Sequence, residues 1–526
     1  MTIKRLILSI LTVVVILLAG ATLLKSFQQP QIQSRLELYQ TNLFLHAAEW
    51  QPQAGEGGNL GSARNTLVGE KPIEAATKQY QEARILAQLN IEKTQDQLQQ
   101  LRSQPITTPA TPKSQSEIAP VTNNSRALQQ DELEKSLNQL QKLTAELDLR
   151  LGLLQVQQGQ TEAATKTWTD FQERSPKGSA LVETAAVLTG LWSNPPRLLP
   201  NAQQLIQENL DGWFRYQALS QLYQLSQRQE ALATLQAQEQ EVAQQALLKL
   251  AFISTIPALA GLLGVGLLLF LVSQRLLKGK ESLLAHNGDL VWETPWSGEI
   301  VWQVFVVGFF LMGQLLIPLV FQLLNLNPIN ADIRTKAFYV LATYLLVAFG
   351  GLGVLYLSIK SFLPLPENWF RFNLRGNWFL WGLGGYCVAL PLVVVVSLIN
   401  QKLWQGQGGS NPLLSLALSG QDKVALAIFF FTAALAAPFF EEFLFRGFLL
   451  PSLTRYTSVS GAIIASSLLF AVAHLSLSEI LPLTTLGIVL GVVYTRSRNL
   501  LAPMLVHSLW NSGTLLSLFI LGSGSS

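Results

Sequence analysis

The sequence predicts an all-α protein: a polytopic bundle of membrane helices with an N-terminal anchor and a soluble helical domain. Hydrophobic residues make up 49% of the 526 residues and charged residues only 13%, a balance typical of chains that contact lipid. The apolar residues are gathered into runs about as long as a bilayer is thick, whereas one long polar stretch contains no such run. We therefore expect at least two units of different composition.

The bulk composition excludes two classes of site. The net charge of +3 is too small and too scattered for a nucleic-acid surface. Cys387 is the only cysteine, so neither an intramolecular disulfide nor a cysteine-rich metal site can form.

The first apolar run extends from Leu6 to Leu24 and follows Lys4 and Arg5. This pattern also fits a secretory signal peptide, with small residues at 19–21 as its cleavage site. The apolar run continues past that point to Lys25, so we expect residues 1–28 to form an uncleaved transmembrane anchor.

Residues 29–248 are polar and rich in Gln, Ala, Leu and Glu, which predicts a soluble helical domain. Residues 105–125 are rich in Thr, Pro, Ser and Asn and are typical of a flexible linker that divides this domain in two.

The second part of the domain has the spacing of a tetratricopeptide repeat. Small residues would let two antiparallel helices approach, an aromatic ring would fill the gap, and a proline would end the second helix. The positions concerned are Leu151, Gly152, Gly159, Ala164, Trp168 and Pro176, with a weaker echo at Ala218, Tyr223 and Ala231. Two interpretations follow: a plain pair of helical hairpins, or a short solenoid that docks a protein partner or presents substrate.

Further apolar segments predict about nine spans when the anchor is included. They are Leu250–Val272, Val301–Leu324, Phe338–Ile359, Trp378–Ile399, Val424–Leu450, Ser460–His474, Ile480–Tyr494 and Leu501–Leu521. The shorter ones, between Ser460 and Tyr494, are marginal in length and are compatible with tilted or re-entrant segments. We expect residues 249–376 to be linking membrane helices and residues 377–526 to be a membrane core.

Basic residues predict the orientation, because Lys and Arg near span ends stay in the cytoplasm. With a cytoplasmic N-terminus the inside flanks are the richer ones, carrying Lys4, Arg5, Arg275, Lys278, Lys280, Lys360, Arg371, Arg375, Arg455, Arg496 and Arg498. The soluble domain is therefore expected on the non-cytoplasmic side.

Three ionisable residues interrupt one apolar helix. Ionisable side chains in the hydrocarbon region are costly and mark functional candidates. Glu442 and Arg446 are four residues apart, so they can neutralise each other on one helix face. Glu441 projects about 100° away and has no local counter-ion.

Two of the four histidines lie in the same C-terminal region. His474 ends the span that contains Phe470, and His507 shares a helix face with Asn511. With a rise of about 1.5 Å per residue, the cytoplasmic ends of the helices place Glu441, His474, Asn511 and His507 at roughly 22, 21, 18 and 12 Å depth. These four side chains can line one cavity.

The residue types fit amide hydrolysis without a covalent nucleophile. A carboxylate in low dielectric can accept a proton from water, and a neighbouring histidine can orient that water. A second histidine with an amide can donate hydrogen bonds to an oxyanion. Each residue also has a structural interpretation: an ion pair for Glu442 and Arg446, a satisfied helix-end histidine for His474, and a helix–helix contact for His507 with Asn511.

Taken in order, Glu441-Glu442-x-x-x-Arg446, Phe470-x-x-x-His474 and His507-x-x-x-Asn511 resemble the three motifs of the CPBP family, the CAAX-protease and bacteriocin-processing proteins. The resemblance covers about 150 residues, from near Trp378 to the end. It implies an intramembrane glutamate/histidine protease in which Glu441, together with His474, activates water. His507 and Asn511 would then stabilise the oxyanion, and Glu442 and Arg446 would support the motif.

Several consequences stay open at this point. A Glu with two His can bind zinc, but without a further protein ligand the metal-free route is favoured, and no cofactor is expected. The expected partners are membrane lipid, a membrane-associated protein or peptide substrate, and a protein at the tetratricopeptide-like domain. A CAAX substrate is not implied. The alternatives are a catalytically silent membrane scaffold or immunity factor of the same fold, and a transporter, for which no inverted repeat is visible.

Overall fold

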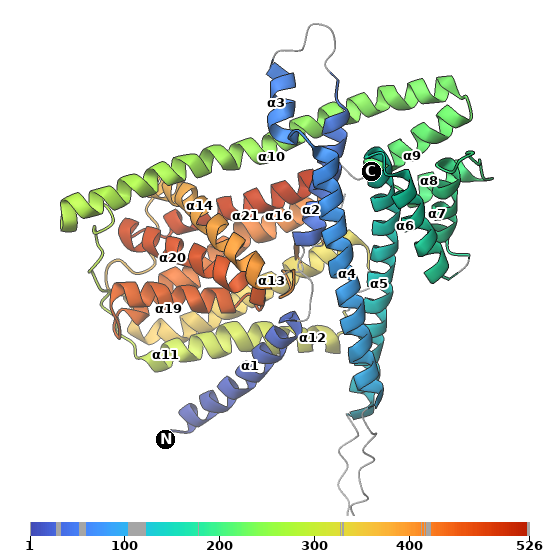
Figure 1. The fold of residues 1–526 in the computed structure, drawn as a ribbon. Helices are drawn as coiled ribbons and strands as arrows, with labels where there is room; N and C mark the ends of the chain where they lie inside the picture. Colours follow the sequence, from blue (N-terminus) through green and yellow to red (C-terminus); the bar gives the residue numbers. More distant parts are fainter. Residues whose placement is uncertain are drawn as a thin grey trace, which may run out of the picture. The chain divides into compact units, whose positions relative to one another are not determined.

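The computed structural model describes residues 2–27, 33–51, 59–103, 122–176, 178–326, 328, 331–404, 406–411, 413–414, 416 and 422–522. Within these ranges the regular elements are helices and no strand forms, which confirms the predicted all-α class. The chain divides into two compact units (Figure 1). Unit 1 contains residues 1–36 and 252–523, and unit 2 contains residues 37–251 with 524–526.

Unit 2 is built from helices of very different lengths. They are α2 (Gln33–Glu49), α3 (Asn59–Val68), α4 (Pro72–Ser103), α5 (Thr122–Gln157), α6 (Thr161–Arg174), α7 (Ala180–Leu191), α8 (Ala202–Asn209), α9 (Gly212–Leu225) and the first part of α10 (Gln229–Lys278). The long helices α4 and α5 lie side by side (Figure 1). A buried Asp148 on α5 pairs with Arg84 of α4 and with Arg174 of α6, which ties the three helices together.

The predicted linker falls between these two helices. Residues 105–121 of it lie outside the described residues, whereas its last four residues begin α5. The sequence predicts a division of the soluble domain at this point, and this division stays a prediction. The helices on either side pack against each other within unit 2, where their buried residues share one apolar core.

The α5–α6 hairpin has the close packing that its small residues predict. Gly159 turns the chain with a positive φ of 76°. A Cβ at Gly152 would lie 2.2 Å from Nε1 of Trp168, so only glycine lets the buried indole lie against α5. The indole N–H donates to the Leu149 carbonyl at 3.2 Å. These contacts describe a tight helical hairpin, and its assignment as a tetratricopeptide repeat stays a prediction.

Unit 1 contains the apolar helices. They are α1 (Ile3–Phe27), the second part of α10, α11 (Gly298–Gln303), η2 (Val304–Leu316), α12 (Ile317–Leu323), α13 (Ile333–Ile359), α14 (Trp378–Trp404), α16 (Lys423–Phe430), η4 (Phe431–Ala436), α17 (Ala437–Glu442), η5 (Phe443–Leu449), α18 (Leu450–Leu453), α19 (Val459–Val472), α20 (Ile480–Ser497) and α21 (Leu501–Gly522). Three short 3₁₀ turns complete the unit: η1 (Gly279–Glu281) after α10, η3 (Lys360–Phe362) after α13, and η6 (Leu477–Glu479) before α20.

Among the described residues, eight helices are long and apolar enough to cross a membrane. The sequence predicts about nine, and the difference is the segment from Ser460 to His474. Its helix, α19, ends at Val472 and has only 14 residues. At about 1.5 Å per residue it covers roughly 21 Å, which is short of a hydrocarbon core of roughly 30 Å.

The first helix is fastened to the membrane unit at three levels. Near its start, Lys4 and Arg5 both pair with Glu299, at 3.1 and 2.8 Å. In its middle, Thr12 accepts a hydrogen bond from Trp302 at 2.7 Å. At its end, the buried Ser26 donates to the Gly408 carbonyl at 2.6 Å. These contacts hold α1 within unit 1, and the assignment of residues 1–28 as an uncleaved anchor stays a prediction.

Helix α10 approaches α14 closely at a single glycine. A Cβ built on Gly264 would lie 1.8 Å from the carbonyl oxygen of Cys387, whereas one on Gly261 or Gly266 would meet nothing within 4 Å. Backbone atoms cannot move aside as a side chain can, so the crossing of the two helices depends on the missing side chain at Gly264.

We therefore expect Gly264→Ala to destabilise the protein by about 1–3 kcal/mol, the usual cost of overpacking. Gly261→Ala, one turn away on the same helix, should leave stability unchanged or slightly raised. Thermal unfolding of the purified protein in detergent measures both. Equal unfolding midpoints for the two variants would show that the α10–α14 crossing is not as close as described.

Candidate active site

The helix that contains the two glutamates is interrupted twice by π-helical turns. The span from Lys423 to Leu453 passes from α16 into π-helical η4, then α17, π-helical η5 and α18. Glu441 and Glu442 end the six-residue α17 between the two π-helical stretches. Wider turns of this kind recur at functional sites because they redirect side chains.

Glu442 and Arg446 form the predicted ion pair. Arg446 Nη1 lies 2.8 Å from Glu442 Oε1, and both side chains are fully buried. Arg446 Nη2 also donates to the Gly487 carbonyl of α20 at 3.2 Å. Its guanidinium lies 4.4 Å from the centre of the Phe470 ring on α19. The pair therefore joins three segments of the membrane unit.

His507 lies between the two glutamates. Its Nδ1 is 2.8 Å from Glu442 Oε1, and its Nε2 is 4.0 Å from Glu441 Oε2. The side chain is only 4% exposed, and that of Glu441 is 14% exposed. Because a carboxylate accepts, Nδ1 of His507 carries the proton in this contact. The helical spacing alone directs the two glutamates apart, yet one imidazole reaches both.

Glu441 has one engaged and one free oxygen. The hydroxyl of Tyr344, on α13, donates to Glu441 Oε1 at 3.1 Å. Glu441 Oε2 is buried and has no hydrogen-bond partner among the described residues. Glu441, for which the sequence predicts no local counter-ion, is thus bonded by Tyr344, a donor from a span that is distant in sequence.

His474 meets the rest of the site through Phe470. It lies in the turn after α19, not at the end of a span as the sequence predicts, because α19 stops at Val472. Its Nδ1 is 2.8 Å from the Phe470 carbonyl, so Nδ1 carries the proton and Nε2 is left as an acceptor. The Phe470 ring lies edge-to-face against both imidazoles, 4.9 Å from His474 and 5.7 Å from His507.

Asn511 fastens α21 to η4. Its Nδ2 donates to the Ala433 carbonyl at 2.7 Å, and Ser508 on the same helix donates to the Ala434 carbonyl. The amide has a second hydrogen that this contact does not use. Glu441, Glu442, Arg446 and His507 therefore form one polar cluster, to which Phe470 connects His474 and the shared helix α21 connects Asn511.

Within the ranges that the structure describes, no three His, Cys, Asp or Glu side chains are grouped closely enough to hold a metal ion. Nδ1 of His507 contacts Glu442 and Nδ1 of His474 contacts a backbone carbonyl, which leaves each Nε2 free, as in histidines that bind metal. The missing grouping, and not these contacts, therefore argues against a metal. A zinc ion needs at least three protein ligands at about 2.0–2.2 Å, so we derive no step through a metal.

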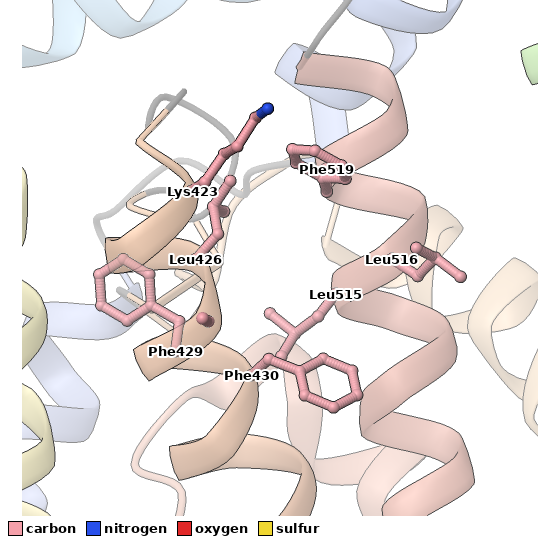
Figure 2. Close-up of a pocket in the computed structure, with 8 residues that line it drawn as sticks. Lys423, Leu426, Phe429, Phe430, Leu515, Leu516 and Phe519 are labelled. Carbon is pink, nitrogen blue, oxygen red and sulfur yellow. The ribbon is translucent and has the colours of Figure 1, made fainter.

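An apolar cavity of about 240 Å³ lies on the seam between α16 and α21 (Figure 2). Side chains from the two helices face each other across it, with Lys423 at one end (Figure 2). The lining includes Phe430 and Leu515, which lie three and four residues from the hydrogen-bonded pair Ala433 and Asn511. The cavity suits hydrocarbon or apolar side chains.

Tyr344 is the site residue that the sequence reasoning missed. That reasoning searched for ionisable groups and their spacing, and a tyrosine is uncharged. The available signal was its position: it lies 11 residues into the 27-residue α13, whereas tyrosines of membrane helices are enriched near the interfaces.

Residues 423–513 match the family model described as Type II CAAX prenyl endopeptidase Rce1-like. This match contains all three motifs, so the resemblance predicted from them is confirmed for this segment. The chain is 27% identical over 137 residues to the membrane-embedded CAAX protease MroQ of Staphylococcus aureus, covering 25% of this chain and 54% of that protein. It is 25% identical over 133 residues to the putative membrane peptidase YdiL of Bacillus subtilis, covering 25% of this chain and 53% of that protein.

The chain thus spans about half the length of the curated relatives it matches. No solved structure matches. The matched segment lies entirely within unit 1, and neither α13 nor unit 2 belongs to it.

The buried ion pair leads to a prediction on stability. Arg446→Met or Glu442→Leu alone leaves one charge buried without its partner and should destabilise the protein by about 3–5 kcal/mol. The double variant removes both charges and should lose much less than the sum of the two.

Thermal unfolding of the four proteins in detergent measures this coupling. Strictly additive losses would mean that the two side chains do not interact across their 2.8 Å contact.

Proposed function

We propose that this chain is an intramembrane endopeptidase that hydrolyses a peptide bond of a membrane-associated protein with a water molecule activated by Glu441. The observation that carries the proposal is the Glu441 carboxylate, whose buried Oε2 has no hydrogen-bond partner among the described residues and lies 4.0 Å from His507 Nε2. The match of residues 423–513 to the Rce1-like family model supports the same reaction.

Water would enter beside the turn that holds His474. Helix α19 begins at Val459 and covers roughly 21 Å, so the turn after it lies well inside the hydrocarbon layer. Irregular backbone at that depth is tolerated only where protein buries it or where water is present. A water molecule at this point can donate one hydrogen bond to Glu441 Oε2 and the other to His474 Nε2. Proton transfer to Glu441 then gives the nucleophile.

His507 and Asn511 supply hydrogen bonds to the oxyanion of the tetrahedral intermediate. His507 is held at Nδ1 by Glu442, so a proton on its Nε2 points away from that anchor and toward the Glu441 side. Asn511 keeps one amide hydrogen beyond the one given to Ala433. Donors fixed before the reaction stabilise developing charge without reorganisation.

Glu442 and Arg446 hold His507 in place without touching the reacting atoms.

A catalytically silent scaffold or immunity factor of the same fold is the alternative, and the match of residues 423–513 to a family model described as an endopeptidase disfavours it.

The chain is an integral multi-pass membrane protein by its eight apolar helices. We further propose the orientation that the basic residues predict, with a cytoplasmic N-terminus and unit 2 on the non-cytoplasmic side. The apolar cavity between α16 and α21 would hold an apolar part of the substrate, because its lining is almost free of polar groups and it lies beside Asn511.

The proposal predicts new protein termini in membranes that express the chain. Glu441→Gln removes the base, and general-base loss lowers rates by about 10²–10⁴-fold, so those termini should vanish. A comparison of N-terminal peptides by mass spectrometry measures them.

Glu281→Gln, an exposed carboxylate beyond the end of α10, is the matched control and should leave the termini unchanged. Identical peptide sets from wild type and Glu441→Gln, with both proteins present in equal amounts, would reject the protease and favour the scaffold.

For unit 2 we propose recruitment of the protein substrate. A groove of about 410 Å³ lies among α4, α5 and α6, and its lining combines the apolar Ile85 with the charged Lys166 and Asp170. A groove with an apolar centre and charges of both signs suits a segment of a protein chain.

Ile85→Glu should therefore lower the yield of the new termini several-fold while leaving the amount of folded protein unchanged. Leu89→Glu is the matched control, because Leu89 lies one turn away on α4 with nearly the same exposure, 55% against 54%, and does not line the groove. Equal yields from both variants would argue against recruitment at this groove.

A further inference from the structure

The hydroxyl of Tyr344 makes the one side-chain hydrogen bond that the structure records at the Glu441 carboxylate, at 3.1 Å from Oε1. We infer that Tyr344 is a positioning residue: it holds Oε1 of Glu441 so that Oε2 stays directed at the His507 side and free to take a proton from water. This inference rests on the proposed hydrolase function and adds to it a residue from outside the segment that matches the family model.

The ring of Tyr344 is fixed by packing. It lies edge-to-face against Phe440, with ring centres 6.1 Å apart and an interplanar angle of 86°. Phe440 is itself buried and stacks on Phe309 at 6.2 Å. This packing restricts the rotation of the ring and so fixes the position of its hydroxyl. Its other neighbour, the Ala437 carbonyl, is 3.5 Å away and is the weaker acceptor.

A carboxylate needs such a constraint. The terminal torsion of a glutamate is broad and roughly two-fold, so its two oxygens exchange places easily. A donor on one oxygen breaks this equivalence. With Oε1 held by Tyr344, Oε2 is the oxygen that remains without a partner and faces His507 Nε2.

Among the described residues, the ionisable groups near Glu441 are otherwise engaged or too far away. Arg446 is committed to Glu442 and to the Gly487 carbonyl, and His507, held at Nδ1 by Glu442, has its Nε2 at 4.0 Å, beyond hydrogen-bond distance. His474 is turned to the Phe470 carbonyl through its Nδ1. The donor comes from α13, which is remote in sequence, so the base is set by contact between two spans.

Tyr344→Phe removes the hydroxyl and keeps the packed ring. We expect kcat for formation of the new terminus to fall about 10- to 100-fold, as when a reacting group is misplaced, with KM changed by less than about twofold. The assay uses the protein substrate identified by the Glu441→Gln comparison, mixed with purified enzyme in liposomes. Tyr339→Phe is the matched control on the same helix, because Tyr339 packs on Phe321 at 5.0 Å and should leave both constants unchanged.

A second measurement covers the case in which Tyr344→Phe folds poorly. In a double-mutant cycle on thermal unfolding, Tyr344→Phe should have less effect in a Glu441→Leu background than in wild type, because its acceptor is gone. Additive shifts would overturn the contact and with it the inference.

The outcomes separate the two proposals. Cleavage by wild type, none by Glu441→Gln and unchanged kcat for Tyr344→Phe would reject the role of Tyr344 and leave the protease intact. A rise in KM with unchanged kcat would also reject it, since that pattern marks substrate binding. No cleavage by wild type would reject the protease and the positioning role together.

Discussion

The buried contact between Glu442 and Arg446 is the constraint on which the candidate site depends. Two opposite charges inside a lipid-spanning helix are best tolerated as a pair. Other atoms of the pair contact the neighbouring helices: Gly487 of α20 accepts from Arg446, Phe470 of α19 covers its guanidinium, and His507 of α21 bonds to Glu442. Helix α21, which carries His507 and Asn511, is therefore held against this pair.

Much of this could be predicted from the sequence, for identifiable reasons. The all-α membrane class follows from apolar runs, and the ion pair follows from the spacing of Glu442 and Arg446, since both signals are local in the chain. The helical rise gives Glu441 and His507 depths of roughly 22 and 12 Å, whereas the structure places their side chains 4.0 Å apart. The hairpin at Gly152 and Trp168 was visible because small and large residues recur at complementary positions.

What the sequence could not show depends on contacts between distant segments. The π-helical turns on both sides of α17, the short helix that contains the two glutamates, have no reliable local signal in the sequence. Helical spacing predicts that Glu441 and Glu442 point in different directions, whereas in the structure both lie near the imidazole of His507. The end of α19 at Val472 and the bond from Tyr344 are decided by packing, which no periodicity records.

The bond network at the end of α1 has a consequence for biosynthesis. Ser26 donates to Gly408 and accepts from the amide of Leu477, a residue 451 positions later and three beyond His474. At a translation rate of about 5–20 residues per second, the first helix waits for roughly 20–90 seconds before its partner is synthesised. During that interval the loop that carries His474 has not been made. The C-terminal end of α1 therefore reaches its final hydrogen-bonded position only after nearly the whole chain has been synthesised.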